Sequence, residues 1–169
     1  MNQESRKHSK PLNFAKTHLN LNLYIGFFIN PLNFWRFLMA NVSLEKALFV
    51  QTPNKVGTTA KVTNTIANTQ TNIRTMWAGE ANDKGNFSLI TTDNQKAKDA
   101  LIQANFNDIT EQDVIVVRVP DESGSASNIA SKLGDNGINI NFFYSSIFDN
   151  QPVLVLSTKD NLQALKLLK

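Results

Sequence analysis

The stretch VPDESGSASNIASKLGDNGININ (residues 119–141) repeats, without a gap, the stretch TPNKVGTTAKVTNTIANTQTNIR (residues 52–74). The offset between them is 67 positions (119 − 52), and it aligns Pro53 with Pro120 and Gly57 with Gly124. The same offset continues to the C-terminus, where the identical pairs include Leu89 and Leu156, Thr91 and Thr158, Asp93 and Asp160, Asn94 and Asn161, and Leu101 and Leu168. One ungapped offset held across a whole unit indicates an internal duplication.

The length and charge of the chain fit two small domains behind a different N-terminal segment. A chain of 169 residues can form two domains that each bury a small core. We expect a leader at 1–38, a first domain at 45–110 and a second domain at 111–169. The leader has five basic residues and one acidic residue, so the rest of the chain has 12 basic (17 − 5) and 13 acidic (14 − 1) residues. This near-neutral region lacks the basic footprint of a nucleic-acid-binding domain.

The repeated region also lacks the residue types of the commonest catalytic and metal sites. The chain contains no cysteine, and its two histidines, His8 and His18, both lie in the leader. This composition excludes disulfides, thiolate nucleophiles and cysteine-based metal sites, and it removes imidazole as a general base from the repeats. We therefore expect a protein that is not an enzyme and has neither a cofactor nor a metal site.

The leader does not resemble the repeats. Its most apolar part, NLNLYIGFFINPLNFW (residues 20–35), is interrupted by Asn, Gly and Pro residues, unlike the run of about 20 apolar residues that spans a bilayer. It also lacks the clean apolar stretch and small-residue cleavage site of a secretory signal. We expect residues 1–38 to be upstream sequence that precedes a true start at Met39. A membrane-associating tail and a disordered arm are the alternatives, and mass spectrometry of the native N-terminus distinguishes the first hypothesis from both.

Residue patterns predict the same order of elements in each repeat: strand, helix, strand, strand, helix, strand. For the first repeat they indicate a strand at 46–51, a helix at 57–69, a strand at 72–79, a hairpin turn at 82–85, a strand at 86–92, a helix N-capped by Asp93 and an extended piece at 106–110. For the second they indicate a strand at 113–119, a helix at 124–135, strands at 139–147 and 152–158, and a helix from Asp160. No final strand is visible after it, so we expect this edge to stay open or to be completed by the other repeat or another chain.

This order predicts an α+β protein built from two ferredoxin-like βαββαβ units, each an antiparallel sheet with its helices on one face. The strands carry consecutive apolar residues, as in Ile115–Val117 and Val153–Leu156. A sheet with one wet face alternates apolar and polar residues instead. We therefore expect the helix-free face to be covered by the other repeat or by a second chain, and we expect a homodimer. Four aromatic residues are expected in the core or an interface rather than as stacking platforms: Trp77, Phe142, Phe143 and Tyr144.

The element order, the Pro- and Gly-marked turn before the first helix, and Asn-Ile at the start of the second strand resemble the ACT domain. In that family the turn reads close to Pro-Gly-x-Leu, and the helix is followed by Gly-x-Asn-Ile. Residues 46–169 are similar to small stand-alone proteins made of two ACT domains in tandem. The resemblance implies a cytoplasmic regulatory protein that binds an amino acid between paired domains and reports its concentration to an enzyme or regulator.

By match to the family motif, the resemblance assigns ligand contacts to three positions in each repeat. They are Asn54, Gly57 and Asn72 in the first repeat, and Asp121, Gly124 and Asn139 in the second. A glycine turn presents backbone N–H groups at a helix N-terminus, where the helix dipole favours a carboxylate. Polar side chains beside the turn can bind the ammonium group, and the two asparagines after the helices can donate and accept hydrogen bonds.

Each of these residues also has a purely structural interpretation. The glycines can serve only the turn, the polar residues Asn54, Asp121 and Ser123 can cap the following helix, and Asn72 and Asn139 can adopt a left-handed turn. The sequence also departs from the family pattern: Val56 and Ser123 replace the proline before each glycine, and Gln70-Thr71 replaces the Gly-x of the first Asn-Ile motif. ACT domains that pair without a small ligand therefore remain an alternative.

Three functions are compatible with these patterns. The first is an amino-acid sensor, and the second is an assembly module that pairs with itself or with an enzyme. The third is an RNA-binding ferredoxin-like domain such as the RRM, which uses aromatics on its open sheet face. The near-neutral repeats argue against RNA, and we expect neither a nucleic-acid nor a membrane partner.

Overall fold

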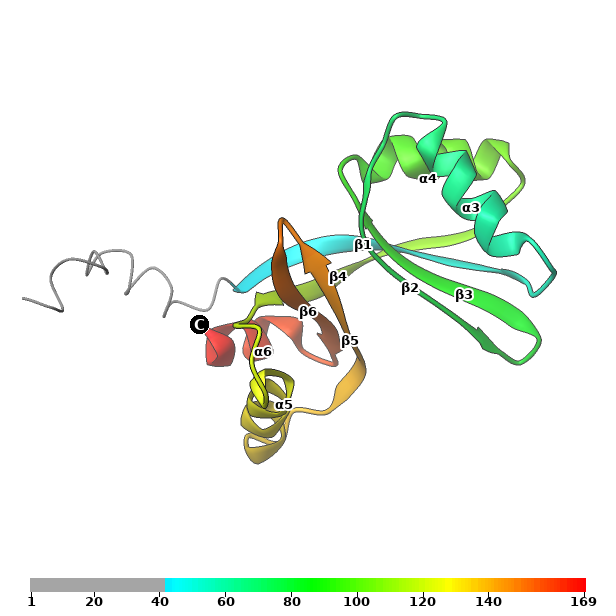
Figure 1. Ribbon diagram of the computed structural model, residues 1–169. Helices are drawn as coiled ribbons and strands as arrows, with labels where there is room; N and C mark the ends of the chain where they lie inside the picture. Colours follow the sequence, from blue (N-terminus) through cyan, green and yellow to red (C-terminus); the bar gives the residue numbers. More distant parts are fainter. Residues whose placement is uncertain (1–41) are drawn as a thin grey trace, which may run out of the picture. The chain divides into compact units, whose positions relative to one another are not determined.

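The computed structural model describes residues 42–169, and these form two repeats in the predicted order (Figure 1). The first repeat consists of β1 (Val42–Pro53), α3 (Thr58–Ala67), β2 (Ile73–Ala81), β3 (Lys84–Thr91), α4 (Asn94–Gln103) and the first half of β4 (Asp108–Arg118). The second half of β4 begins the second repeat, which continues with α5 (Ser125–Asp135), β5 (Ile140–Phe148), β6 (Gln151–Thr158) and α6 (Asn161–Leu168). The leader lies outside the described residues, so our expectation for it stays a prediction.

The six strands form one antiparallel sheet in the order β2-β3-β1-β4-β6-β5. The α+β, ferredoxin-like prediction is therefore confirmed. Tight two-residue turns at Asn82–Asp83 and Asp149–Asn150 join the hairpins, and all four residues have positive φ, as such turns require. Asp93 accepts a hydrogen bond from the Lys96 backbone N–H at 3.0 Å, so it caps α4 as predicted.

The two central strands belong to both repeats. The pieces expected at 106–110 and 113–119 are parts of the continuous strand β4, so the expected boundary between 110 and 111 falls within a strand. The first half of β1, Val42–Lys46, pairs with Asp113–Val117 of the second repeat. It occupies the place of the final strand that the second repeat lacks. Of the possibilities for this edge, the structure selects completion by the other repeat.

Each repeat buries a core between its helices and the sheet. In the first repeat Leu48, Val50, Phe87 and Leu89 on the strands meet Val62, Ile66, Ala97 and Leu101 on the helices. In the second, Ile115, Val117, Leu154 and Leu156 meet Leu133, Ala164 and Leu168. These core residues have even numbers on β1 and odd numbers on β4. Within each strand they point to one side, because side chains alternate along a strand. The helices therefore cover one face of the strands of their own repeat.

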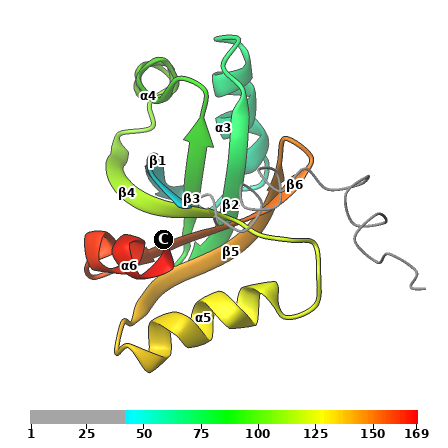
Figure 2. The ribbon, with the colours of Figure 1, turned by 90° about the vertical axis from the view of Figure 1, so that its left-hand side faces the viewer.

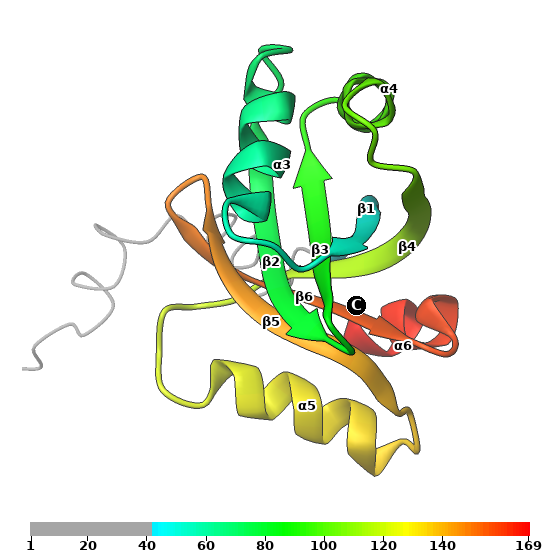
Figure 3. The ribbon, with the colours of Figure 1, turned by 90° about the vertical axis from the view of Figure 1, so that its right-hand side faces the viewer.

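The opposite, helix-free faces of the two repeats pack on each other. Ala47, Ile90, Val114, Val116, Val153 and Val155 form this third core, flanked by Phe49, Phe142, Tyr144 and Phe148. Figures 2 and 3 show the arrangement, with α3 and α4 on one side, α5 and α6 on the other, and the strands between them. The consecutive apolar residues of β4 and β6 are explained because both faces are buried. The cover expected from the other repeat or a second chain is supplied within the chain.

Two asparagines in equivalent positions fasten the second helix of each repeat to the sheet. Asn94 donates from Nδ2 to the Lys46 carbonyl at 2.9 Å, and Asn161 donates from Nδ2 to the Asp113 carbonyl at 2.7 Å. Each also accepts a hydrogen bond at Oδ1 from a backbone N–H, that of Thr91 or Thr158. The duplication therefore preserves tertiary hydrogen bonds as well as the chain order.

Within residues 42–169, no helix is long and apolar enough to cross a membrane. In the same part of the chain, His, Cys, Asp and Glu side chains form no group of three that could hold a metal ion.

Candidate functional site: the helix-opening turns

The first turn places Gly57 at the N-terminus of α3 in a left-handed conformation, with φ 86° and ψ −3°. A β-carbon at this position would have no neighbour within 4 Å. The need for glycine is therefore conformational, since residues with a β-carbon rarely adopt this φ. No side chain caps the helix. Backbone N–H groups of the first turn beyond Thr58 consequently have no partner within the helix, and they can bind an anion such as a carboxylate.

The second turn repeats this geometry. Gly124 has φ 95° and ψ −11° and opens α5 without a side-chain cap. Ser125 instead donates from its hydroxyl to the Pro120 carbonyl at 2.8 Å, which closes the loop on itself. Asn54, Asp121 and Ser123 thus cap neither helix, and the capping interpretation is wrong. Glycine provides the turn alone, so the polar side chains beside it are free of that role.

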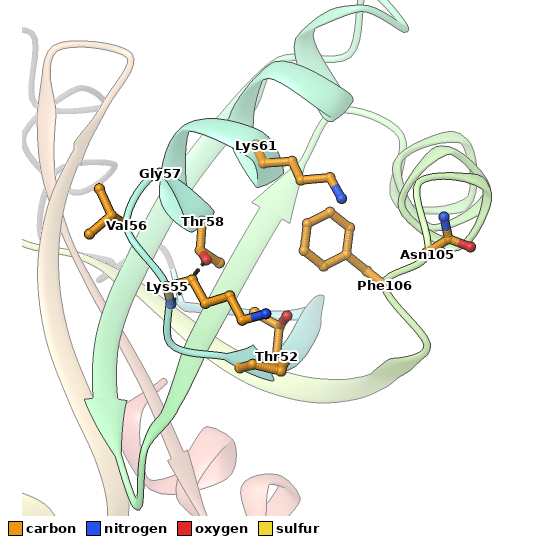
Figure 4. Close-up of a pocket in the computed structure, with 9 residues that line it drawn as sticks. Thr52, Lys55, Val56, Gly57, Thr58, Lys61, Asn105 and Phe106 are labelled. Carbon is orange, nitrogen blue, oxygen red and sulfur yellow. Dashed lines mark hydrogen bonds between the residues drawn. The ribbon is translucent and has the colours of Figure 1, made fainter.

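A pocket of about 340 Å³ lies beside the first turn (Figure 4). Its walls come from the end of β1, the start of α3 and the loop between α4 and β4. The polar and aromatic lining consists of Thr52, Lys55, Thr58, Lys61, Asn105 and Phe106. The Lys61 ammonium lies 5.1 Å from the centre of the Phe106 ring, within the range of a cation–π contact. Because two lysines and no carboxylate line it, the pocket favours an anionic group.

The second turn carries the opposite charge. The positions equivalent to Lys55 and Lys61 are Glu122 and Asn128, and Asp121 replaces Asn54. Two adjacent carboxylates at this turn repel an anion and attract an ammonium group. The two turns therefore share a backbone geometry but differ in the ligand atom that they favour.

Asn72 and Asn139 lie at the far ends of their helices from the glycine turns. A helix of ten residues, such as α3, separates its ends by about 15 Å. Asn72 pairs with Thr92, through its backbone N–H to the Thr92 hydroxyl at 3.0 Å and its carbonyl to the Thr92 N–H at 2.9 Å. The left-handed residues here are Gln70 and Gly137, with φ 60° and 70°. The left-handed interpretation of the asparagines is wrong, and the pocket at Gly57 does not include Asn72.

The sequence did not single out Lys55, Lys61, Asn105 or Phe106. The two lysines bracket the glycine at a spacing that could have indicated a basic turn. Phe106 gave no signal, because its place depends on how the loop after α4 meets α3. Among the aromatics, Phe142, Phe143 and Tyr144 pack against the cores as predicted. Trp77 does not belong to a core, since 45% of it is exposed, and its place in an interface stays a prediction.

Comparison with known proteins decides the family. A family model described as an ACT domain pair matches residues 43–168. The chain belongs to the ACT domain pair family. This match spans both repeats, including the first half of β1 that completes the second one. No curated protein sequence matches this ACT domain pair.

Solved structures show the same fold. The ACT domain pair is similar to protein BT0572 from Bacteroides thetaiotaomicron, with 25% identity, a TM-score of 0.67, and coverage of 76% of this chain and 89% of that one. It is also similar to the regulatory subunit of aspartate kinase from Thermus flavus, with 16% identity, a TM-score of 0.53, and coverage of 75% and 94%. A structure of aspartokinase α and β subunits gives 16% identity, a TM-score of 0.55, and coverage of 77% and 95%. Membership of the ACT family supports a regulatory role.

Proposed function

We propose that this ACT domain pair is a cytoplasmic, non-catalytic sensor that binds a free amino acid at its helix-opening turns and reports its concentration to an enzyme or regulator. The main support for this proposal is that Gly57 and Gly124 both begin a helix in a left-handed conformation without a side-chain cap. At the first turn, where two lysines line the pocket, the uncapped N–H groups and the helix dipole suit an α-carboxylate. Regulation is also the role named for the aspartate kinase subunit with the same fold.

The charges beside the turns favour the ligand's carboxylate at the first turn and its ammonium group at the second. Lys55 and Lys61 add positive charge at the first turn, and Asp121 and Glu122 add negative charge at the second. Asn72 and Asn139 lie too far from the glycine of their own repeat to join it in one site. A second copy of the chain would bring the asparagine end of one repeat beside the glycine turn of another. We therefore propose that the binding protein is a homodimer.

An assembly module without a small ligand is the second candidate. The observation that favours it is Val56, a fully exposed apolar residue at the tip of the first turn. In Figure 4 its side chain points away from Lys61 and Phe106. An exposed apolar tip suits contact with a protein surface. An RRM-like function is disfavoured, because the repeats are near neutral and because apolar residues of their helix-free faces pack on each other.

Thermal unfolding against the twenty amino acids at millimolar concentration tests the sensor. A ligand that binds only the folded protein raises its Tm by mass action. We expect a rise with one or a few amino acids, and we expect Gly124→Val to abolish it because valine cannot adopt φ 95° without strain. Gly134→Ala is the matched control, since Gly134 lies within α5 and a β-carbon there meets nothing within 4 Å.

Asn139→Ala tests the asparagine assignment separately, with the exposed Asn141→Ala as its control. A Tm that no amino acid changes, in a protein that sediments as a dimer, would reject the sensor and favour the assembly module. A monomer that still binds an amino acid would reject the proposed interface.

A further inference from the structure

The helix-free face of the first repeat carries a groove across four strands. The register aligns Gly79, Asn86, Gln51 and Asp108 in one row, and Trp77, Ser88, Phe49 and Thr110 in the next. Hollows of about 450 and 200 Å³ adjoin here and share Gln51, Trp77 and Asn86. We call the smaller hollow the Trp77 groove. Besides Val50 and Phe87, its lining consists of Phe49, Gln51, Trp77, Asn86, Asp108 and Thr110.

Gly79 leaves room for the indole of Trp77. A β-carbon at Gly79 would lie 2.6 Å from the Trp77 ring, so the ring lies directly over this glycine. The indole thus leans along β2 from the second row toward the first row, which contains Gln51 and Asp108. Trp77 remains 45% exposed. Among aromatic side chains, an exposed indole face binds a cation most strongly.

The second repeat fills the equivalent place. Its counterparts of Ala81 and Gln51 are Phe148 and Arg118. The guanidinium of Arg74 lies 4.1 Å from the centre of the Phe148 ring, and that of Arg118 lies 5.2 Å from it. Glu45 accepts two hydrogen bonds from Arg74, at 2.6 and 3.4 Å. An aromatic ring, a guanidinium and a carboxylate therefore pack together where the first repeat has a groove.

The Trp77 groove contains two of these three components. Trp77 supplies the aromatic face, and Asp108 supplies a carboxylate that has no ion pair within residues 42–169. Ala81, which lines the adjoining hollow, and Gln51 are the smaller, uncharged counterparts of Phe148 and Arg118. We propose that the Trp77 groove binds the guanidinium group of a small molecule, stacked on Trp77 and paired with Asp108. This site lies on the face opposite the helices, so it does not depend on ligand binding at the turns.

The other polar groups fit this assignment. A planar guanidinium has five N–H donors and needs acceptors around its edge. Gln51, Asn86 and Thr110 line the same hollow as Asp108. The Asn86 Oδ1 accepts a hydrogen bond from Gln51 Nε2 at 2.8 Å, and the Gln51 Oε1 accepts one from the Lys84 ammonium at 2.7 Å. Each of these oxygens has a second lone pair for a guanidinium N–H. Lys84 lines the adjoining hollow and not the Trp77 groove.

Titration of the ¹⁵N-labelled full-length chain with L-arginine, followed by NMR, tests the proposal. L-citrulline is the matched control, because it replaces the charged guanidinium with a neutral urea group of similar shape. We expect arginine to shift the Trp77 indole N–H and the side-chain amides of Gln51 and Asn86, with citrulline at least about tenfold weaker. Agmatine, which has the guanidinium but no carboxylate, is expected to shift the same signals.

Two variants then locate the site. Asp108→Asn is expected to weaken arginine binding by about tenfold. Ala81→Phe, which introduces the residue found in the second repeat, is expected to abolish it. A Tm near that of the parent protein shows that each variant is folded. If Ala81→Phe does not fold, the arginine affinity of Asp108→Asn alone tests the proposal. Equal shifts with citrulline, unchanged affinity in Asp108→Asn, or shifts confined to the turns at Gly57 and Gly124 would each overturn the proposal. The last result would still support binding at the turns, so the two proposals fail separately.

Discussion

The two repeats share one plan on their helix sides and differ on their helix-free faces. Ile66 and Leu133 occupy equivalent positions and are both fully buried under the helices. Trp77 and Tyr144 are also equivalent, yet Trp77 is 45% exposed and Tyr144 hydrogen-bonds to Thr75 of the other repeat at 3.1 Å. The ring of Tyr144 stacks on Phe142, with 6.2 Å between ring centres, whereas the first repeat has the smaller Thr75 at the position equivalent to Phe142. Duplication has kept the parts that fold each repeat and has changed those that face the outside or the other repeat.

The largest expected effect tests whether the helix-side cores act as one unit. Ile66→Ala and Leu133→Ala each leave a cavity in a fully buried position, which costs about 2–5 kcal/mol of unfolding free energy. Because both repeats share β1 and β4, we expect either variant to lower the Tm of a single, cooperative transition measured by calorimetry. Two separate transitions, with only the mutated repeat shifted, would contradict a shared sheet that couples the repeats.

A smaller and equal effect is expected at the two preserved asparagines. Asn94→Ala and Asn161→Ala each remove a hydrogen bond to the neighbouring strand and leave the N–H of Thr91 or Thr158 without its partner. Buried groups left unpaired in this way cost about 1–3 kcal/mol. Urea unfolding should give nearly the same loss for both variants. A loss confined to one repeat would show that equivalent hydrogen bonds are not energetically equivalent.

An unequal effect is expected where the repeats differ. Arg74 pairs with Glu45 across partly buried side chains and lies on Phe148, so Arg74→Ala should cost about 1 kcal/mol or more. Its equivalent Asn141 is exposed, and Asn141→Ala should change the free energy of unfolding by less than about 0.5 kcal/mol. Part of the Arg74 effect should decrease in high salt. Equal effects of the two changes would remove the asymmetry inferred from the structure.

The smallest expected effect appears only at alkaline pH. Burial raises the pKa of Tyr144 above the usual 10.0, and the hydrogen bond to Thr75 only partly opposes this. The folded state therefore holds the phenol proton more tightly than the unfolded state. This contribution to stability is complete below about pH 10 and is lost as the pH rises through the raised pKa. Tyr144→Phe should flatten the fall in unfolding free energy between about pH 9 and 11, whereas Trp77→Phe should leave its slope unchanged.

Much of the fold could be predicted because its signals are local. Pro53, Gly57 and Asp93 mark turns and a cap through their own backbone preferences. The full length of β1 could not be predicted, because Val42–Glu45 form a strand only against Val114–Val117 of the other repeat. The pocket at Lys61 likewise depends on Phe106 from a distant loop. Residues whose environment is set by contacts distant in sequence carry no local signal.

The pairing of Lys46 with Asp113 distinguishes the duplicated chain from a pair of identical subunits. These two residues are directly opposite each other in the β1–β4 ladder, and they are also equivalent positions of the repeat (113 − 46 = 67). In a symmetric dimer of one repeat, this residue would face its own copy, and two lysines or two aspartates would repel. Here the charges differ and meet at 2.8 Å. The pair is too exposed to add much stability. Its consequence is selectivity. At this position each repeat is complementary to the other repeat and repels a second copy of itself, which disfavours pairing of two identical repeats from different molecules.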